Sequence, residues 1–247
     1  MVLSSDLTTQ PLVTWNLLPD NFVLSNGPVE NIQQPMLAAA LTAALGENGL
    51  IQSGMLIGTS FALVATINKQ TVVKAPDWFY VPRVLPVSAD VSRRGYTQHR
   101  EGDPVAVVME FLSTEGWGDL SLRDIPPYGK LYFYEQILQV PTYVTYDPYG
   151  PTLQVRCLEK DQYVLQTADT NGRFYIPELQ LKLGMWRGER LGETTHWLRW
   201  WNQSDELLLW SSEQVDIERQ KAEAERQKAE LLAAKLRELG IDPETLG

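Results

Sequence analysis

Runs of apolar residues predict a series of β-strands through the middle of the chain. The strongest run is 104–112 (PVAVVMEFL), which is apolar on both faces and therefore predicts an inner strand covered on both sides. Further apolar or β-branched runs predict strands at 55–66, 72–73, 78–85, 142–146 and 152–158.

The later part of the chain has a weaker strand pattern. Polar turns predict short strands and then a loop that ends at Leu183. The aromatic and apolar segments 196–201 (HWLRWW) and 207–210 (LLLW) predict a late hairpin, with Asn202–Asp205 as its turn.

Two segments before residue 140 have the composition of helices. Residues 30–46 are rich in Ala and Leu and end at Gly46, and residues 129–139 (GKLYFYEQILQ) follow a long loop that contains Gly and Pro. Helices that alternate with strands in this way indicate an α/β or α+β fold.

The C-terminal part of the chain predicts one long helix. Residues 213–239 contain no Gly or Pro, and the hexamer ERQKAE occurs at 218 and again at 225, which is a seven-residue repeat. A coiled coil needs an apolar seam, and here only Leu232, Leu236 and Leu239 supply one. Two alternatives therefore stay open, a solvated helix with surface ion pairs and a weak self-association helix that makes a homodimer.

Composition narrows the class of protein. The 247 residues include 21 Lys and Arg against 31 Asp and Glu, and the net charge of −10 excludes a generally basic nucleic-acid coat protein but not a local basic channel. The single cysteine, Cys157, excludes an internal disulfide framework. The longest apolar-biased stretch, 36–45, is far shorter than a membrane span, and the first 20 residues lack the pattern of an export signal, so we expect a cytoplasmic protein.

Two acidic residues stand where a metal site could form. Glu110 lies inside the strongest predicted strand, where an unpaired charge would be costly, so a cation or hydrogen bonds must compensate it. Asp77 follows Pro76 at the start of another predicted strand. If the two strands are neighbours, both carboxylates could bind one Mg²⁺, which prefers oxygen ligands.

A lysine and a tyrosine could complete this site. Lys130 and Tyr134 are four residues apart and so share one face of the predicted helix. A lysine aimed at a metal-bound phosphate would neutralise developing charge. Taken singly, each residue has an ordinary interpretation: Pro-Asp as a turn, a strand glutamate as a salt-bridge partner, a first-turn lysine as a solvated side chain.

Several motifs in order resemble the Uma-two family, which belongs to the PD-(D/E)xK restriction-endonuclease-like superfamily. They are Pro76-Asp77, Glu110–Ser113, Tyr128–Lys130 with Tyr134, Val140–Tyr143 and Tyr146–Pro148. The resemblance covers residues 28–247 and implies a mixed central β-sheet flanked by helices. The implied organisation is an N-terminal arm at 1–27, a nuclease domain at 28–212 and a C-terminal charged helix at 213–247.

The resemblance also implies roles for particular residues. Asp77 and Glu110 would be the metal-binding acids of a Mg²⁺-dependent DNA endonuclease, with Mn²⁺ as a possible substitute. Leu112 stands where the superfamily usually has its lysine, and Lys130 would replace that lysine from the helix. Further candidates are the acids Glu30 and Asp119, together with Tyr134.

The polar loop 87–103 offers candidate contacts to the DNA backbone through Arg93, Arg94 and Arg100. An exposed solubilising loop is an equally good interpretation of these residues. Two alternatives to an active endonuclease also stay open. One is a nuclease-like protein that binds without cutting, which the charge of −10 favours, and the other is an interaction protein that works through its C-terminal helix.

Overall fold

The computed structural model describes residues 12–17, 19, 32–88, 90, 92–112 and 123–238. Its centre is a six-stranded sheet in the order β2-β5-β6-β7-β8-β9. These strands are β2 (Leu56–Gly58), β5 (Trp78–Val81), β6 (Val107–Phe111), β7 (Thr142–Asp147), β8 (Thr152–Glu159) and β9 (Gln162–Leu165). β6 and β7 are parallel and every other neighbouring pair is antiparallel, so the sheet is mixed, as predicted.

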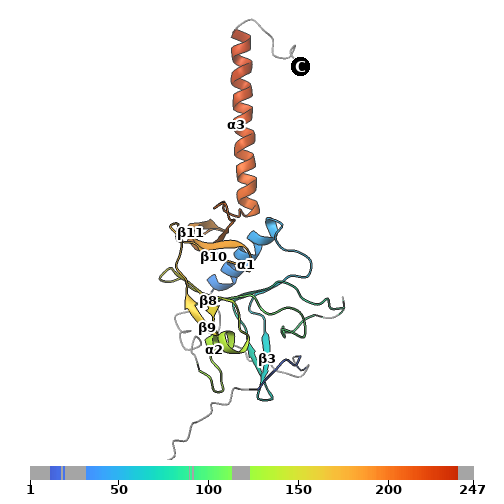
Figure 1. The fold of residues 1–247 in the computed structure, drawn as a ribbon. Helices are drawn as coiled ribbons and strands as arrows, with labels where there is room; N and C mark the ends of the chain where they lie inside the picture. Colours follow the sequence, from blue (N-terminus) through green and yellow to red (C-terminus); the bar gives the residue numbers. More distant parts are fainter. Residues whose placement is uncertain are drawn as a thin grey trace, which may run out of the picture.

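Helices cover the two faces of this sheet (Figure 1). On one face lies α1 (Gln33–Glu47), and on the other lie α2 (Lys130–Tyr132) and the π-helix η2 (Phe133–Ile137). β6 is buried along its whole length because alternate residues pack toward opposite layers: Met109 belongs to the core on the α1 side and Val108 to the core on the α2 side. The prediction of an inner, doubly covered strand at 104–112 is therefore confirmed.

Two three-stranded sheets flank the central one. The first is made of β1 (Val13–Thr14), β3 (Leu63–Ile67) and β4 (Gln70–Lys74), and the second of β10 (Phe174–Ile176), β11 (Leu181–Arg190) and β12 (Glu193–Trp201). The predicted single strand 55–66 is wrong, because β2 and β3 belong to different sheets. Ser60 lies between them with a positive φ of 45°, which breaks the extended run.

The late hairpin also differs from the prediction. β12 pairs along its full length with β11, which begins where a loop was expected to end, and Leu191 and Gly192 form the turn. Residues 207–210 form no strand, and only an isolated bridge joins Leu207 to Trp201. The pattern of β11 is obscured because Lys182, Arg187 and two glycines interrupt its apolar residues.

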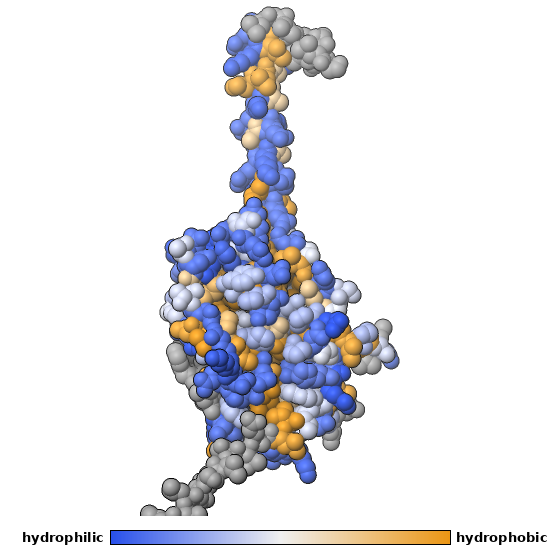
Figure 2. Space-filling view, viewed as in Figure 1, coloured by the Kyte–Doolittle hydropathy of each residue, from blue (hydrophilic) through white to orange (hydrophobic). Residues whose placement is uncertain are grey.

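The predicted C-terminal helix is present as α3 (Ser211–Glu238). It extends away from the body as one straight helix (Figure 1), and its surface is mainly hydrophilic (Figure 2). None of its described residues is buried, and several of its charges form ion pairs within the helix, such as Asp216–Arg219 and Glu218–Lys221. Across the described part of the chain, no helix combines the length and apolar content that a bilayer span requires.

The junction between the body and α3 is held by a buried arginine. Arg199 of β12 has no exposed surface, and its guanidinium lies 3.3 Å from the ring centre of Trp210. It donates hydrogen bonds to both carboxylate oxygens of Glu213, at 3.0 and 2.6 Å. Glu213 also accepts a bond from the Trp210 backbone N–H, which caps the first turn of α3.

Candidate active site

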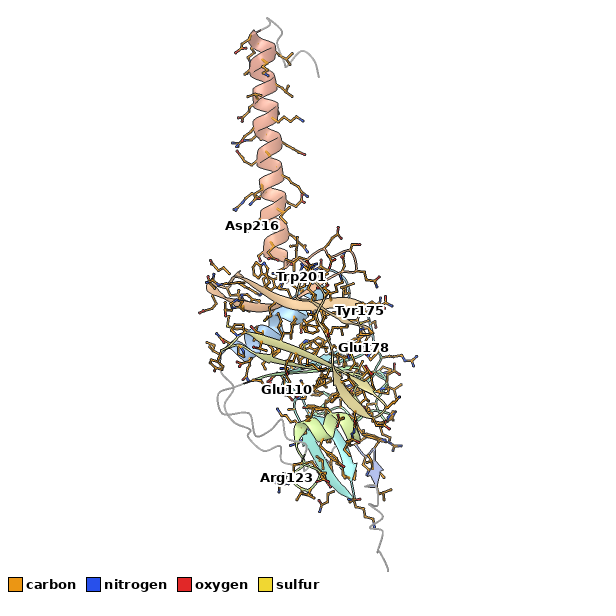
Figure 3. The ribbon with its side chains drawn as sticks, turned by 60° about the vertical axis from the view of Figure 1, so that its left-hand side comes forward. Glu110, Arg123, Tyr175, Glu178, Trp201 and Asp216 are labelled. Carbon is orange, nitrogen blue, oxygen red and sulfur yellow. The ribbon has the colours of Figure 1, made fainter. Side chains whose placement is uncertain are left out.

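Glu110 of β6 is a buried carboxylate with two side-chain donors. Only 4% of the residue is exposed, yet neither oxygen is left without a partner. Lys130 Nζ lies 2.9 Å from Glu110 Oε2, and the Tyr134 hydroxyl donates to Glu110 Oε1 at 2.8 Å. Figure 3 labels Glu110 in the body of the molecule, between the central sheet and α2. The compensation expected for a strand carboxylate is therefore supplied by a lysine and a tyrosine.

The helical spacing of these two donors explains why both reach Glu110. α2 begins at Lys130 with Gly129 as its N-cap, and Tyr134 lies one turn later in η2. In η2 the Leu138 N–H bonds to the Phe133 carbonyl, five residues back. Such π-turns are rare and often occur at functional sites. The expectation that Lys130 and Tyr134 share one face is confirmed.

Asp77 lies beside Glu110 at the same edge of the sheet. Trp78 of β5 pairs with Met109 of β6, so one more step along the same register places Asp77 opposite Glu110. The Asp77 Oδ2 atom accepts a hydrogen bond from the Phe111 backbone N–H at 2.5 Å. Gln34 of α1 donates to the carbonyl of the same Phe111, so hydrogen bonds fix both the N–H and the carbonyl of this residue. The sequence left open whether the two acidic strands are neighbours, and the fold shows that they are.

The charge of Glu110 raises the pKa of two buried tyrosines, Tyr134 and Tyr143. Burial, followed by the Glu110 charge and its hydrogen bond, raises the pKa of Tyr134 well above its ordinary value of 10.0. Burial and Glu110 also raise the pKa of Tyr143 on β7, whose ring centre lies 5.7 Å from that of Tyr134. The Tyr143 hydroxyl has no hydrogen-bond partner among the described residues. Both phenols therefore stay protonated to a higher pH than an exposed tyrosine does.

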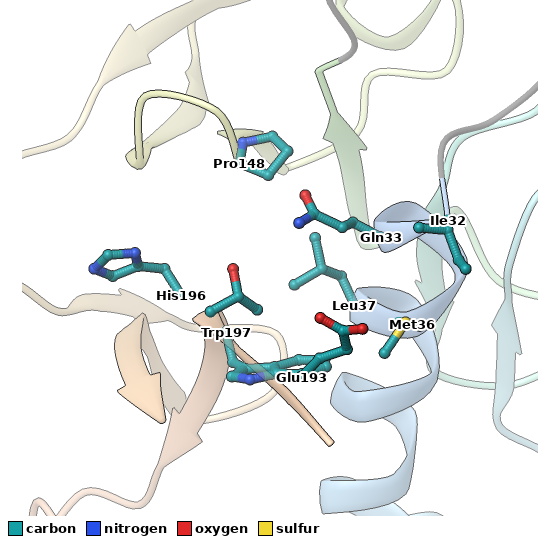
Figure 4. A pocket seen from close by; sticks show the side chains of 9 residues that line it. Ile32, Gln33, Met36, Leu37, Pro148, Glu193, His196 and Trp197 are labelled. Carbon is teal, nitrogen blue, oxygen red and sulfur yellow. The ribbon is translucent and has the colours of Figure 1, made fainter. Parts of the chain in front are cut away.

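An open cavity of about 340 Å³ adjoins Asp77. Its other walls are the N-terminal half of α1, including Gln34, and the Thr59–Ser60 turn after β2. A smaller cavity of about 70 Å³ lies between α1, Pro148 and β12, with Leu37 and Trp197 among its lining residues (Figure 4). The smaller cavity contains neither acid, so the larger one is the space from which a ligand would meet Asp77.

The donor chemistry at this edge suits a hard divalent cation. Two carboxylates on adjacent strands supply oxygen ligands, and Mg²⁺ commonly binds one or two carboxylates while it keeps several waters. Within the described ranges, no group of three or more His, Cys, Asp or Glu residues gathers in a metal-binding arrangement. Among the described residues, Asp77 and Glu110 are the two carboxylates that adjacent strands bring together here, and they would hold such an ion together with water or substrate oxygens.

The remaining sequence candidates fall elsewhere. Glu30 and Asp119 lie outside the described residues. Arg93 is engaged in the loop itself, because it pairs with Glu101 at 2.5 Å and also donates to the Leu85 carbonyl. Arg94 and Arg100 are exposed. Of the three loop arginines, Arg93 thus has a structural partner that the sequence did not predict.

Sequence reasoning overlooked two residues on the α2 side of the sheet, Tyr143 and Arg156. Tyr143 is the last residue of the family-like motif Val140–Tyr143, but the position of its buried hydroxyl in the field of Glu110 gives no sequence signal of its own. Arg156 of β8 alternates with apolar residues, a pattern that normally indicates a solvent-facing side chain.

A family model described as "Putative restriction endonuclease", Uma2, matches residues 25–192. That range is more than half of the 247 residues and includes Asp77, Glu110 and Lys130. The chain belongs to the Uma2 family. The resemblance drawn from the motifs is thereby confirmed. No curated protein matches the chain. β12 and α3 lie beyond the residues that the Uma2 model covers.

Proposed function

We propose that this Uma2 protein is a Mg²⁺-dependent endonuclease that hydrolyses DNA phosphodiester bonds. The observation that carries the proposal is the cluster at the edge of β5 and β6, where Glu110 bonds to Lys130 and lies opposite Asp77. The family description supports a nuclease. The cavity that adjoins Asp77 gives substrate a path to that carboxylate.

Each residue of the cluster has a role in this proposal. Asp77 and Glu110 would hold Mg²⁺ or Mn²⁺, and a bound ion supplies Lewis-acid stabilisation and an activated water. Lys130 places a positive charge beside the bound phosphate and stabilises the charge that develops there. Tyr134 is a positioning residue, because its hydroxyl fixes Glu110 and stays protonated.

An incubation with DNA and different metals tests the activity itself. Purified protein is mixed with supercoiled plasmid or with single-stranded DNA, in Mg²⁺, in Mn²⁺ or in EDTA. We expect nicked and linear products in the two metals and intact DNA in EDTA. Intact DNA in all three conditions would contradict the proposal, and cleavage that persists in EDTA would contradict its metal dependence.

A second candidate function is an interaction module that uses α3, in a protein whose nuclease-like body binds without cutting. The observation that favours it is that none of the described residues of α3 is buried, although the helix spans 28 residues. Light scattering on the full chain and on a chain ending at Gln220 tests it. A dimer mass that falls to a monomer mass on truncation supports this role and a homodimer, whereas equal monomer masses contradict both.

A further inference from the structure

A second cation, Arg156 of β8, lies on the same face of the central sheet as Glu110. In the strand register Glu110 is beside Thr145, and Thr145 is beside Gln154, so these three residues form one row across β6, β7 and β8. Arg156 stands in the next row, opposite Tyr143. Directly paired residues point to the same side of a sheet, so Arg156 shares the α2 side with Glu110.

Arg156 is held by two neutral groups, and no other hydrogen bond to its guanidinium is found within the described residues. Its guanidinium donates to Thr145 Oγ1 at 3.2 Å and to Gln154 Oε1 at 2.7 Å. Arginine has five N–H donors, and these two bonds orient the fork without neutralising its charge. No carboxylate within the described residues pairs with Arg156, whereas Arg93 and Arg199 are both paired with glutamates.

The charges of Arg156 and Glu110 act on one common atom. Glu110 raises the pKa of the Tyr143 phenol, whereas Arg156 lowers it, so the buried hydroxyl lies in the fields of both. The two residues are also linked through Thr145, which is one strand away from Glu110, about 4.8 Å, and 3.2 Å from the guanidinium. Arg156 therefore lies two strands away from Glu110, and its guanidinium reaches back to Thr145 on the strand between them.

We propose that Arg156 binds a backbone phosphate of the DNA strand adjacent to the phosphate that is cut. The planar guanidinium fork matches phosphate oxygens, and a partly buried, pre-oriented cation loses little freedom on binding. In a protein with a net charge of −10, such a local cation would offset the repulsion of DNA where the strand must lie. This inference rests on the proposed function, since it names a contact of the same substrate.

Salt-dependent DNA binding tests the contact without reference to turnover. Fluorescence anisotropy of a labelled duplex is measured in Ca²⁺ over a series of KCl concentrations, and a gel confirms that the duplex stays intact. Wild type is compared with Arg156→Gln, with Arg156→Lys and with Arg187→Gln, which removes an exposed arginine of β11 in another sheet. Thermal melting of each variant confirms folding.

We expect Arg156→Gln to weaken binding roughly tenfold and to reduce the slope of log K against log salt by about 0.9. Arg156→Lys keeps the charge and should keep the slope, with weaker affinity because the fork is lost. Arg187→Gln should change neither quantity. An unchanged affinity and slope in Arg156→Gln, an equal loss in Arg187→Gln, or an absence of wild-type binding would each overturn the inference.

A parallel plasmid assay in Mg²⁺ separates this inference from the proposed function. Metal-dependent cleavage by wild type, together with normal binding by Arg156→Gln, would overturn the Arg156 contact and leave the endonuclease proposal standing. An absence of cleavage, together with the selective binding loss in Arg156→Gln, would do the reverse.

Discussion

At the scale of single residues, the two buried tyrosines beside Glu110 differ in the hydrogen bonding of their hydroxyl groups. The Tyr134 hydroxyl bonds to Glu110, whereas the Tyr143 hydroxyl has no partner among the described residues. We expect Tyr134→Phe to lower the free energy of unfolding by about 1–3 kcal/mol, because the buried carboxylate loses a donor. Urea denaturation followed by tryptophan fluorescence measures the change.

Tyr143→Phe is the matched control for that substitution. It removes an oxygen of the same kind at a neighbouring buried position, but one that has no hydrogen-bond partner within the described part of the chain. We expect a free energy of unfolding equal to or slightly above that of wild type, within about 1 kcal/mol. Equal losses in both variants would show that the bond to Glu110 contributes nothing specific.

The raised pKa values of Tyr134 and Tyr143 predict a loss of stability in alkali. In the folded chain both phenols have a pKa above the ordinary value of 10.0. Below pH 10 they are protonated in the folded and in the unfolded chain, so their ionisation costs no stability there. Above pH 10 the unfolded chain ionises first, and stability falls as the pH rises. We expect the stability gap between Tyr143→Phe and wild type to widen from pH 8 to pH 10.5, measured as the urea midpoint. A stability gap that stays constant over this pH range would contradict the raised pKa of Tyr143.

At the scale of elements, the start of α3 depends on one buried ion pair. Arg199 is fully buried and Glu213 is its only carboxylate partner within the described residues. Glu213→Ala would leave the arginine charge unpaired and the first turn uncapped, so we expect about 3–5 kcal/mol of destabilisation. Thermal or urea unfolding measures it.

Glu218→Ala provides the control on the same helix. Glu218 pairs with Lys221, and both side chains are mostly exposed, so the loss should stay within about 0.5 kcal/mol. A Glu213→Ala variant as stable as Glu218→Ala would contradict the anchoring role of Arg199.

The elements that the sequence predicted well are those with a uniform pattern. β6 is continuously apolar, and α3 lacks Gly and Pro, so local composition specifies both. The division of 55–66 into two strands depends on a turn at Ser60 with positive φ, a conformation that this residue type does not favour. β11 has little strand pattern of its own and is specified by its partner β12.

In the candidate site, too, local features could be predicted from the sequence and tertiary contacts could not. Lys130 and Tyr134 were found because their spacing of four residues is a local property of a helix. The contact of that helix face with Glu110 is a tertiary property, although the burial of a charge required some such partner. Arg156 could not be found in this way, because its nearness to Glu110 arises only from the register of three strands.

At the scale of the whole molecule, the distal part of α3 contributes little to the stability of the body. The described residues of α3 are all unburied, and its ion pairs beyond Gln220 are internal to the helix. We expect a chain that ends at Gln220 to unfold within about 2 °C of the full chain. This shortened chain should also keep whatever DNA-cleavage activity the full chain has. Scanning calorimetry measures the transition, and a drop well beyond that range would show that distal α3 packs on the body or on another chain.

The central claim is that the carboxylates at the edge of β5 and β6 hold the metal that cuts DNA. The most direct test is the rate of Mg²⁺-dependent plasmid nicking by wild type and by Glu110→Gln, with Glu218→Gln on α3 as the matched control. Glu110→Gln keeps the shape of the side chain, and Lys130 is partly exposed and can reach solvent, so the fold should survive. We predict at least about 100-fold slower nicking in Glu110→Gln and an unchanged rate in Glu218→Gln. Nicking at the wild-type rate by a folded Glu110→Gln protein would contradict the claim.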